Sequence, residues 1–128
     1  MLVYIAGPIG GMHNYNQLAF HQAQRFLERT GHRVINPIQM DRDYDGEINA
    51  HANQLVYARR DTGVILGLRG ERFKGIPIYH DTIDAIYLLR GWSKSVGSRA
   101  ELALAQWIGA KTMLEDPNER RAILEVNG

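Results

Sequence analysis

The 128-residue chain contains no cysteine, which excludes a disulfide framework and a thiolate metal site. It also lacks an excess of one charge, since 15 Lys and Arg residues face 14 Asp and Glu residues. This balance gives no electrostatic footprint for a nucleic acid polymer or an anionic membrane. No apolar run approaches the roughly 18 residues of a membrane-spanning helix, and residues 1–8 lack the basic segment of a signal peptide. We therefore expect a soluble, cytoplasmic protein that binds neither polymer nor membrane.

The composition is that of an ordinary globular protein, with 45% hydrophobic and 23% charged residues. A chain of this length buries enough surface for a real core and is most simply one domain, spanning residues 1–128. Internal repeats and low-complexity segments are absent from the sequence.

The first 37 residues predict a strand, a helix and a second strand. Residues 2–6 form a short apolar run that Gly7 and Pro8 interrupt, which is typical of a buried parallel strand. Apolar residues recur at helical spacing over 16–30, and residues 32–37 are again strand-like. A strand, helix and strand in this order imply a parallel sheet of an α/β protein.

The rest of the chain continues this alternation, with two polar interruptions. We expect a solvated acidic loop over 38–47, a helix over 48–66, a loop or excursion over 67–80, a strand over 81–89, a helix over 95–109, a strand over 111–114 and a helix over 117–126.

Glu101 is the residue whose position most needs a chemical explanation. It continues a helix face that carries Leu104, Ala105 and Ile108, which should be turned toward the protein. A carboxylate there must be hydrogen-bonded, paired or in use. Two interpretations stay open at this point. Ser98 and Glu101 match a capping box, or Glu101 faces a pocket and stabilises the positive charge that develops when a glycosidic bond breaks.

Three loops end predicted parallel strands at one edge of the sheet, where ligands of such sheets bind. They are residues 7–16, 36–40 and 90–98, and none matches a dinucleotide or P-loop motif. The helix that follows the third loop offers its N-terminus to an anion such as phosphate, with Ser95 and Ser98 as further donors.

Other candidate residues have ordinary structural explanations beside the functional ones. Asp61 follows two arginines, so it either forms a surface ion pair or supplies the second carboxylate of glycosidic chemistry. Trp92 is either a packed aromatic or a platform on which a base stacks. The histidines show no metal-site spacing, and the sequence lacks the Gly-x-Ser-x-Gly elbow of an acyl hydrolase.

Several motifs together resemble the nucleoside 2-deoxyribosyltransferase superfamily, in particular an uncharacterised phage and bacterial branch, over about residues 2–111. The motifs are Tyr4-Ile-Ala-Gly-Pro8, residues 16–20, 31–37 and 84–89, Gly91-Trp92, and Ser95-x-Gly-x-x-x-Glu101-x-x-x-Ala105.

The resemblance implies a small flavodoxin-like or Rossmann-like three-layer sandwich with four or five parallel strands. It implies cleavage of the N-glycosidic bond of a nucleoside or nucleoside 5′-monophosphate, with release or exchange of the base and without metal or other cofactor. It places Glu101 as nucleophile, Asp61 at the leaving base and Ser95 at the 5′-phosphate. The remaining substrate-binding positions would be Tyr4, Gly7, Pro8, Ile9, Gly10, Asn36, Trp92, Gly97 and Ser98.

The resemblance also implies a homo-oligomer. Two departures from the family pattern are visible. Residues 8–11 lack the serine and arginine with which the monophosphate hydrolases hold phosphate, and the excursion over 67–80 separates Asp61 from the strand predicted over 81–89 by more than the resemblance implies. Two alternatives of other kinds stay open: a non-catalytic nucleotide-binding or sensing module, and a related phosphoribohydrolase or NAD-cleaving enzyme.

Overall fold

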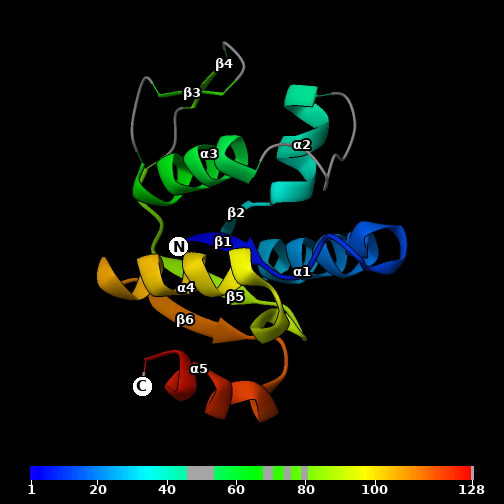
Figure 1. Ribbon diagram of the computed structural model, residues 1–128, viewed down its shortest axis with the longest axis vertical. Helices are drawn as coiled ribbons and strands as arrows, with labels where there is room; N and C mark the ends of the chain where they lie inside the picture. The colour runs from blue at the N-terminus through cyan, green and yellow to red at the C-terminus, as the bar shows by residue number, and fades with distance from the viewer. Residues whose placement is uncertain (46–53, 68–70, 74–75, 79–80, 128) are drawn as a thin grey trace.

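The computed structural model describes residues 1–45, 54–67, 71–73, 76–78 and 81–127 (Figure 1). Its core is a four-stranded sheet in the order β2-β1-β5-β6, and every neighbouring pair is parallel. The strands are β1 (Leu2–Ala6), β2 (Arg33–Ile35), β5 (Ala85–Leu88) and β6 (Lys111–Leu114). Taken in chain order this is 2-1-3-4, which begins the flavodoxin-like order. The predicted α/β fold with a four- or five-stranded parallel sheet is confirmed.

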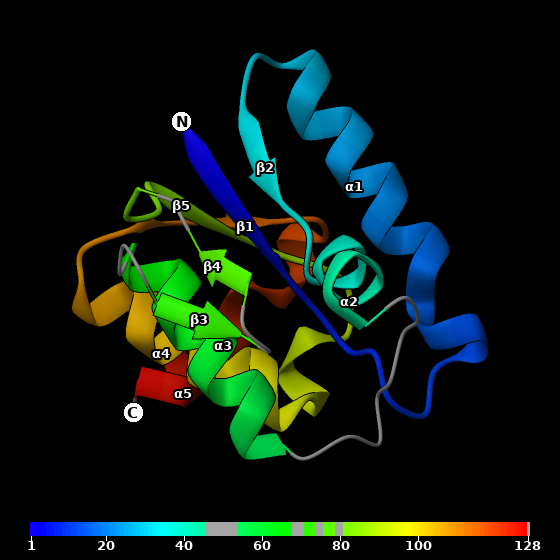
Figure 2. The same cartoon turned by 90° about the horizontal axis from the view of Figure 1, so that it is seen from above.

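The sheet is covered on both faces, because side chains along its central strands alternate between two clusters. Tyr4 and Ile86 pack with residues of α3 and α4, whereas Ile5 and Tyr87 pack on the other face with residues of α1. Helix α1 (Gln17–Arg29) therefore lies on one side of the sheet, and α3 (Gln54–Leu66) and α4 (Val96–Trp107) lie on the other (Figure 2). These are the three layers that the resemblance implied.

Two close contacts position the central strands, one at each end. The strand predicted over 81–89 is shorter in the structure, because Asp84 anchors its start. The Asp84 carboxylate accepts a hydrogen bond of 2.7 Å from the Leu2 amide, which ties the first residue of β1 to the residue before β5. Gly7, after β1, has no room for a side chain, since a Cβ there would lie 2.8 Å from Leu89. The ends of β1 and β5 are thus held close together.

The predicted acidic loop over 38–47 is wrong for the residues that the structure describes. They form helix α2 (Pro37–Asp45), and residues 46 and 47 lie outside the described part. Proline suits the first turn of a helix, and the Asn36 side chain accepts a 3.0 Å hydrogen bond from the Ile38 amide. Asp41 is buried rather than solvated, because it meets Arg60 of α3.

Residues 67–80 also contain more regular structure than predicted. Strands β3 (Glu71–Phe73) and β4 (Ile76–Ile78) pair antiparallel in a separate sheet above α3, away from the main sheet (Figure 1). Residues 68–70, 74–75 and 79–80 lie outside the described part, as do residues 48–53 of the helix predicted over 48–66.

The C-terminal prediction is confirmed. Asp116 caps the short helix η3 (Pro117–Glu119) through a 3.0 Å hydrogen bond from the Asn118 amide, and α5 (Arg120–Asn127) follows directly. Two other single-turn helices, η1 (His13–Asn16) and η2 (Trp92–Lys94), precede α1 and α4. Within the described residues, no helix combines the length and apolar character needed to cross a membrane.

Candidate active site

The start of helix α4 decides between the two interpretations of Glu101. The N-cap is Ser95, whose hydroxyl oxygen accepts a 3.2 Å hydrogen bond from the Ser98 amide. The capping box with Ser98 at the N-cap is therefore wrong. Ser95 has extended backbone angles and a hydroxyl three residues before the Ser98 amide, so the helix begins one turn earlier than the box requires. Glu101 lies in the second turn, and its side chain is not needed to cap the helix.

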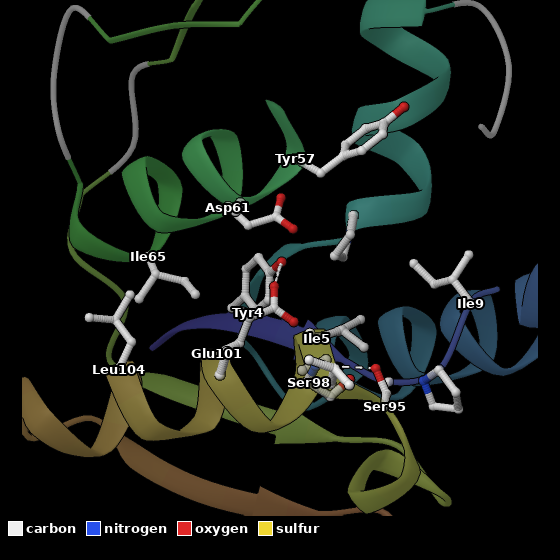
Figure 3. Close-up of a pocket in the computed structure, with 18 of the residues that line it drawn as sticks. Tyr4, Ile5, Ile9, Tyr57, Asp61, Ile65, Ser95, Ser98, Glu101 and Leu104 are labelled. Carbon is white, nitrogen blue, oxygen red and sulfur yellow. Dashed lines mark hydrogen bonds between the residues drawn. The ribbon is translucent and has the colours of Figure 1, made fainter. Parts of the chain in front are cut away.

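The Glu101 carboxyl instead meets Tyr4 of β1. The Tyr4 hydroxyl donates a short hydrogen bond to Oε2 of Glu101. Tyr4 is fully buried in the sheet, whereas Glu101 is only partly buried. Asp61 of α3 faces the same point from the opposite side (Figure 3). Three elements thus bring a phenol and two carboxyls together.

The ionisation of this group is strongly perturbed. Burial and the charge of Asp61 raise the pKa of Glu101 well above its ordinary value, although the Tyr4 hydrogen bond and the charge of Arg60 oppose the rise. Burial, with the charges of Asp61 and Glu101, also raises the pKa of Tyr4, so Tyr4 stays a neutral donor.

Asp61 is held by a buried arginine. Nε of Arg60 lies 2.8 Å from Oδ1 of Asp61, and Nη1 of Arg60 lies 2.5 Å from Oδ1 of Asp41. The Arg60 guanidinium also stacks 4.9 Å from the centre of the Tyr57 ring. Burial lowers the pKa of Arg60, but Asp61 and Asp41 more than offset this and the net pKa is raised. The guanidinium is therefore permanently charged.

This ion pair differs from the surface pair that the sequence suggested, because Arg60 is only 3% exposed. Sequence reasoning missed Arg60 and Asp41 as site residues. A signal was present in the spacing, since Arg60 lies three residues after Tyr57 and four before the buried Val64. A charge on that helix face requires a buried partner.

A cavity of about 950 Å³ opens above this cluster. It lies beyond the carboxyl ends of β1 and β5, where the strand order reverses and where ligands of open parallel sheets bind. The volume falls in the range of pockets that hold small organic ligands. Helices α3 and α4 form its walls, and the loop after β1 closes one end (Figure 3).

The structure brings most of the predicted site residues to this cavity. Its lining includes Tyr4, Gly7, Pro8, Ile9, Gly10, Asp61, Ser95, Gly97, Ser98 and Glu101. Asn36 and Trp92 do not line it. Asn36 is buried, and its amide donates a 2.9 Å hydrogen bond to Gln24. Trp92 is fully buried in the core beneath α4, where its ring has no face open to a ligand.

The N-terminus of α4 contributes the polar end of the cavity. Ser98 is 1% exposed, and its hydroxyl oxygen has no hydrogen-bond partner among the residues that the structure describes. Lys94 adds a positive charge at the same end. A helix N-terminus with such neighbours favours an anion. Among the residues that the structure describes, no group of three or more His, Asp and Glu side chains is placed to hold a metal ion.

Fold and site together define a small Rossmann-like α/β protein with a carboxyl pair in a cavity at the switch point of its sheet. The family described as "Domain of unknown function (DUF4406)" matches residues 1–66, and the chain belongs to this family. Searches of curated proteins and of solved structures found no match. The family description names no activity, so the nucleoside deoxyribosyltransferase resemblance stays a prediction.

Proposed function

We propose that the protein cleaves the N-glycosidic bond of a nucleoside or nucleoside 5′-monophosphate and releases or exchanges the base. The observation that carries the proposal is the Glu101 carboxyl, which takes no part in capping and meets Tyr4 and Asp61 at the cavity. Glycosidic cleavage passes through a transition state with positive charge at the sugar carbon, and a pair of carboxyls is the usual catalytic group for it.

The carboxyl pair supplies both the nucleophile and the proton. Glu101 gives its proton to Asp61, and the resulting carboxylate forms a bond to C1′ as the C1′–N bond breaks. The electron pair of that bond goes to the base nitrogen, which takes the proton from Asp61. Water or a second base then attacks C1′, Glu101 leaves as a carboxylate, and the proton of the attacking group returns to the pair. Tyr4 keeps the Glu101 carboxyl oriented throughout through its hydrogen bond.

The polar residues at one end of the cavity support the proposal that the substrate carries a 5′-phosphate. Ser95, Ser98 and the first amides of α4 lie one to two turns from Glu101, and Lys94 adds a positive charge. The loop after β1 has no serine or arginine over residues 8–11, so these α4 groups would carry the phosphate.

A homo-oligomer forms part of the same proposal. Val96 and Trp107 lie on α4, line the cavity, and are 70% and 86% exposed. Exposed apolar side chains of this size at the mouth of a site favour contact with another protein surface. Light scattering coupled to size-exclusion chromatography tests it: we expect a mass above 14.5 kDa, and a monomer would contradict the proposal.

The main experiment measures free base. The protein is incubated with ribo- and deoxyribonucleoside 5′-monophosphates, the matching free nucleosides and NAD, and the products are separated by chromatography. We expect base release from at least one nucleoside monophosphate, and loss of that activity in Glu101→Ala with an unchanged circular dichroism spectrum.

Unchanged turnover in Glu101→Ala would refute the mechanism. Stabilisation by nucleotides without base release over hours would instead favour a binding or sensing module. Nicotinamide release from NAD alone would favour the NAD-cleaving alternative.

A further inference from the structure

We propose that Arg60 is a positioning residue that fixes the Asp61 carboxyl opposite Glu101 and supplies the charge that lets Glu101 ionise. The role of Arg60 in base release rests on the proposed function, whereas its effect on the carboxyl pair does not. Arg60 lies at the cavity wall, but its side chain is only 2% exposed, so we assign it a role through Asp61 rather than in binding the substrate.

The guanidinium is held in place by contacts from two helices. It bonds Asp41 of α2 at 2.5 Å, bonds Asp61 of α3 at 2.8 Å, and packs against the Tyr57 ring. Side chains of consecutive helix residues point in different directions. Arg60 can therefore bond Asp61 only by reaching across, and Asp41 and Tyr57 keep it in that position. The ion pair in this way restrains the Asp61 carboxyl, which faces Glu101 from α3 (Figure 3).

The charge of Arg60 matters because the carboxyls repel one another. Among the residues that the structure describes, the groups that face the pair are Tyr4 from β1, Arg60 and Tyr57 from α3, and Asp41 from α2, with Lys94 at the far end of the cavity. The cluster of Asp41, Asp61 and ionised Glu101 carries three negative charges. Arg60 is a cation in direct contact with two of these carboxylates. Its positive charge lowers the pKa of Glu101, against burial and the charge of Asp61.

The test compares Asp41→Asn with the double variant Asp41→Asn/Arg60→Gln. Both variants lack Asp41, the more buried of the two carboxylates that Arg60 contacts, so the comparison changes the Arg60 charge while Asp61, with a side chain that is 19% exposed, keeps access to solvent. The readout is the titration midpoint of Glu101, from its side-chain carboxyl carbon shift by NMR between pH 3 and 10. We expect the double variant to raise this midpoint by about 1–3 pH units, the usual effect of an adjacent opposite charge.

Lysine at position 60 provides the conservative control. Asp41→Asn/Arg60→Lys keeps the charge and should return the Glu101 midpoint most of the way to that of Asp41→Asn. If the glutamine variant does not fold, Asp41→Asn/Arg60→Met takes its place, because methionine fills part of the volume of the arginine stem without its charge. The Glu101 midpoint should again rise relative to Asp41→Asn. A midpoint that stays within about 0.3 pH units of that of Asp41→Asn in the uncharged double variant would overturn the proposal.

The same variants separate this inference from the proposed function. The acidic and the basic limb of the pH–rate profile for base release should both shift to higher pH, together with the titration midpoint of Glu101. A shifted midpoint without base release from any protein supports the role of Arg60 and rejects the proposed function. Base release by the wild type with an unmoved midpoint rejects the role of Arg60 and leaves the proposed function standing.

Discussion

Replacing Glu101 by glutamine should stabilise the protein while it abolishes base release. The glutamine side chain keeps an oxygen that accepts the Tyr4 hydrogen bond, but it carries no charge beside Asp61. The folded-state pKa of Glu101 is raised above the unfolded value, so the folded protein holds the Glu101 proton more tightly than the unfolded chain. The stability of the wild type relative to the variant therefore falls as the pH rises from the unfolded-state pKa of Glu101 toward its raised folded-state pKa. Above the folded-state pKa the loss is complete.

The magnitude follows from the linkage between pKa and stability. A difference of one pH unit between the folded and unfolded pKa corresponds to about 1.4 kcal/mol, and the partial exposure of Glu101 allows solvent to reduce this. We expect Glu101→Gln to gain about 1 kcal/mol at pH 8, or roughly 4 °C in melting temperature. At pH 4 the two proteins should melt at nearly the same temperature.

Thermal unfolding followed by circular dichroism from pH 4 to 8 measures this difference. Glu125→Gln on the exposed surface of α5 is the matched control, and it should show no comparable pH-dependent gain. A Glu101→Gln protein less stable than the wild type at pH 8, or a gain that is equal at all pH values, would refute the account of the carboxyl pair.

Three further substitutions test separate contacts. Tyr4→Phe removes the hydroxyl that favours ionised Glu101, so the pH–rate profile should move to higher pH while stability falls by only about 1 kcal/mol. Ser95→Asp keeps the N-cap and the melting temperature, because aspartate caps as well as serine, but it should raise KM for a 5′-monophosphate about tenfold and leave that of the free nucleoside unchanged. Gly7→Ala forces a methyl group to within 2.8 Å of a leucine side chain and should lower stability by about 1–3 kcal/mol; Gly97→Ala, where a Cβ meets its nearest atom at 4.0 Å, is its control and should show no such loss.

The central strands of the sheet were predictable from the sequence because each is a short apolar run. The runs at 2–6 and 85–88 needed no knowledge of their partners. Helix α2 was not predictable in the same way. Its acidic residues have poor local helix preference, and its stability depends on a cap from Asn36 and on the contact of Asp41 with Arg60. Asp41 and Arg60 are both charged, which in the sequence suggests exposed positions. They are buried because they form an ion pair between α2 and α3.

The candidate site was predictable to the extent that topology fixes it. Parallel strands place the loops after β1 and β5 together, and so Ser95, Gly7 and Gly10 reach one cavity. The capping-box interpretation of Glu101 is wrong because the start of α4 could not be located from the sequence. Three serines lie near it, at positions 93, 95 and 98, and the pattern alone does not identify the N-cap. Trp92 follows the same loop, but its size and apolar ring place it in the core.

The region that matches the family model contains only one member of the carboxyl pair. This affects how a function should be assigned to the chain. The matched residues 1–66 contain Tyr4 and Asp61 and end with α3. Glu101 lies beyond them, on a helix reached only through β5, and β5 is also the strand that pairs with β1 along the Tyr4 register. The first half of the chain therefore provides the phenol donor and the carboxylates that Arg60 holds, but not the Glu101 carboxyl that accepts the Tyr4 hydrogen bond. An activity based on the pair belongs to the whole sheet, and Glu101→Gln is a more direct test of it than any substitution within residues 1–66.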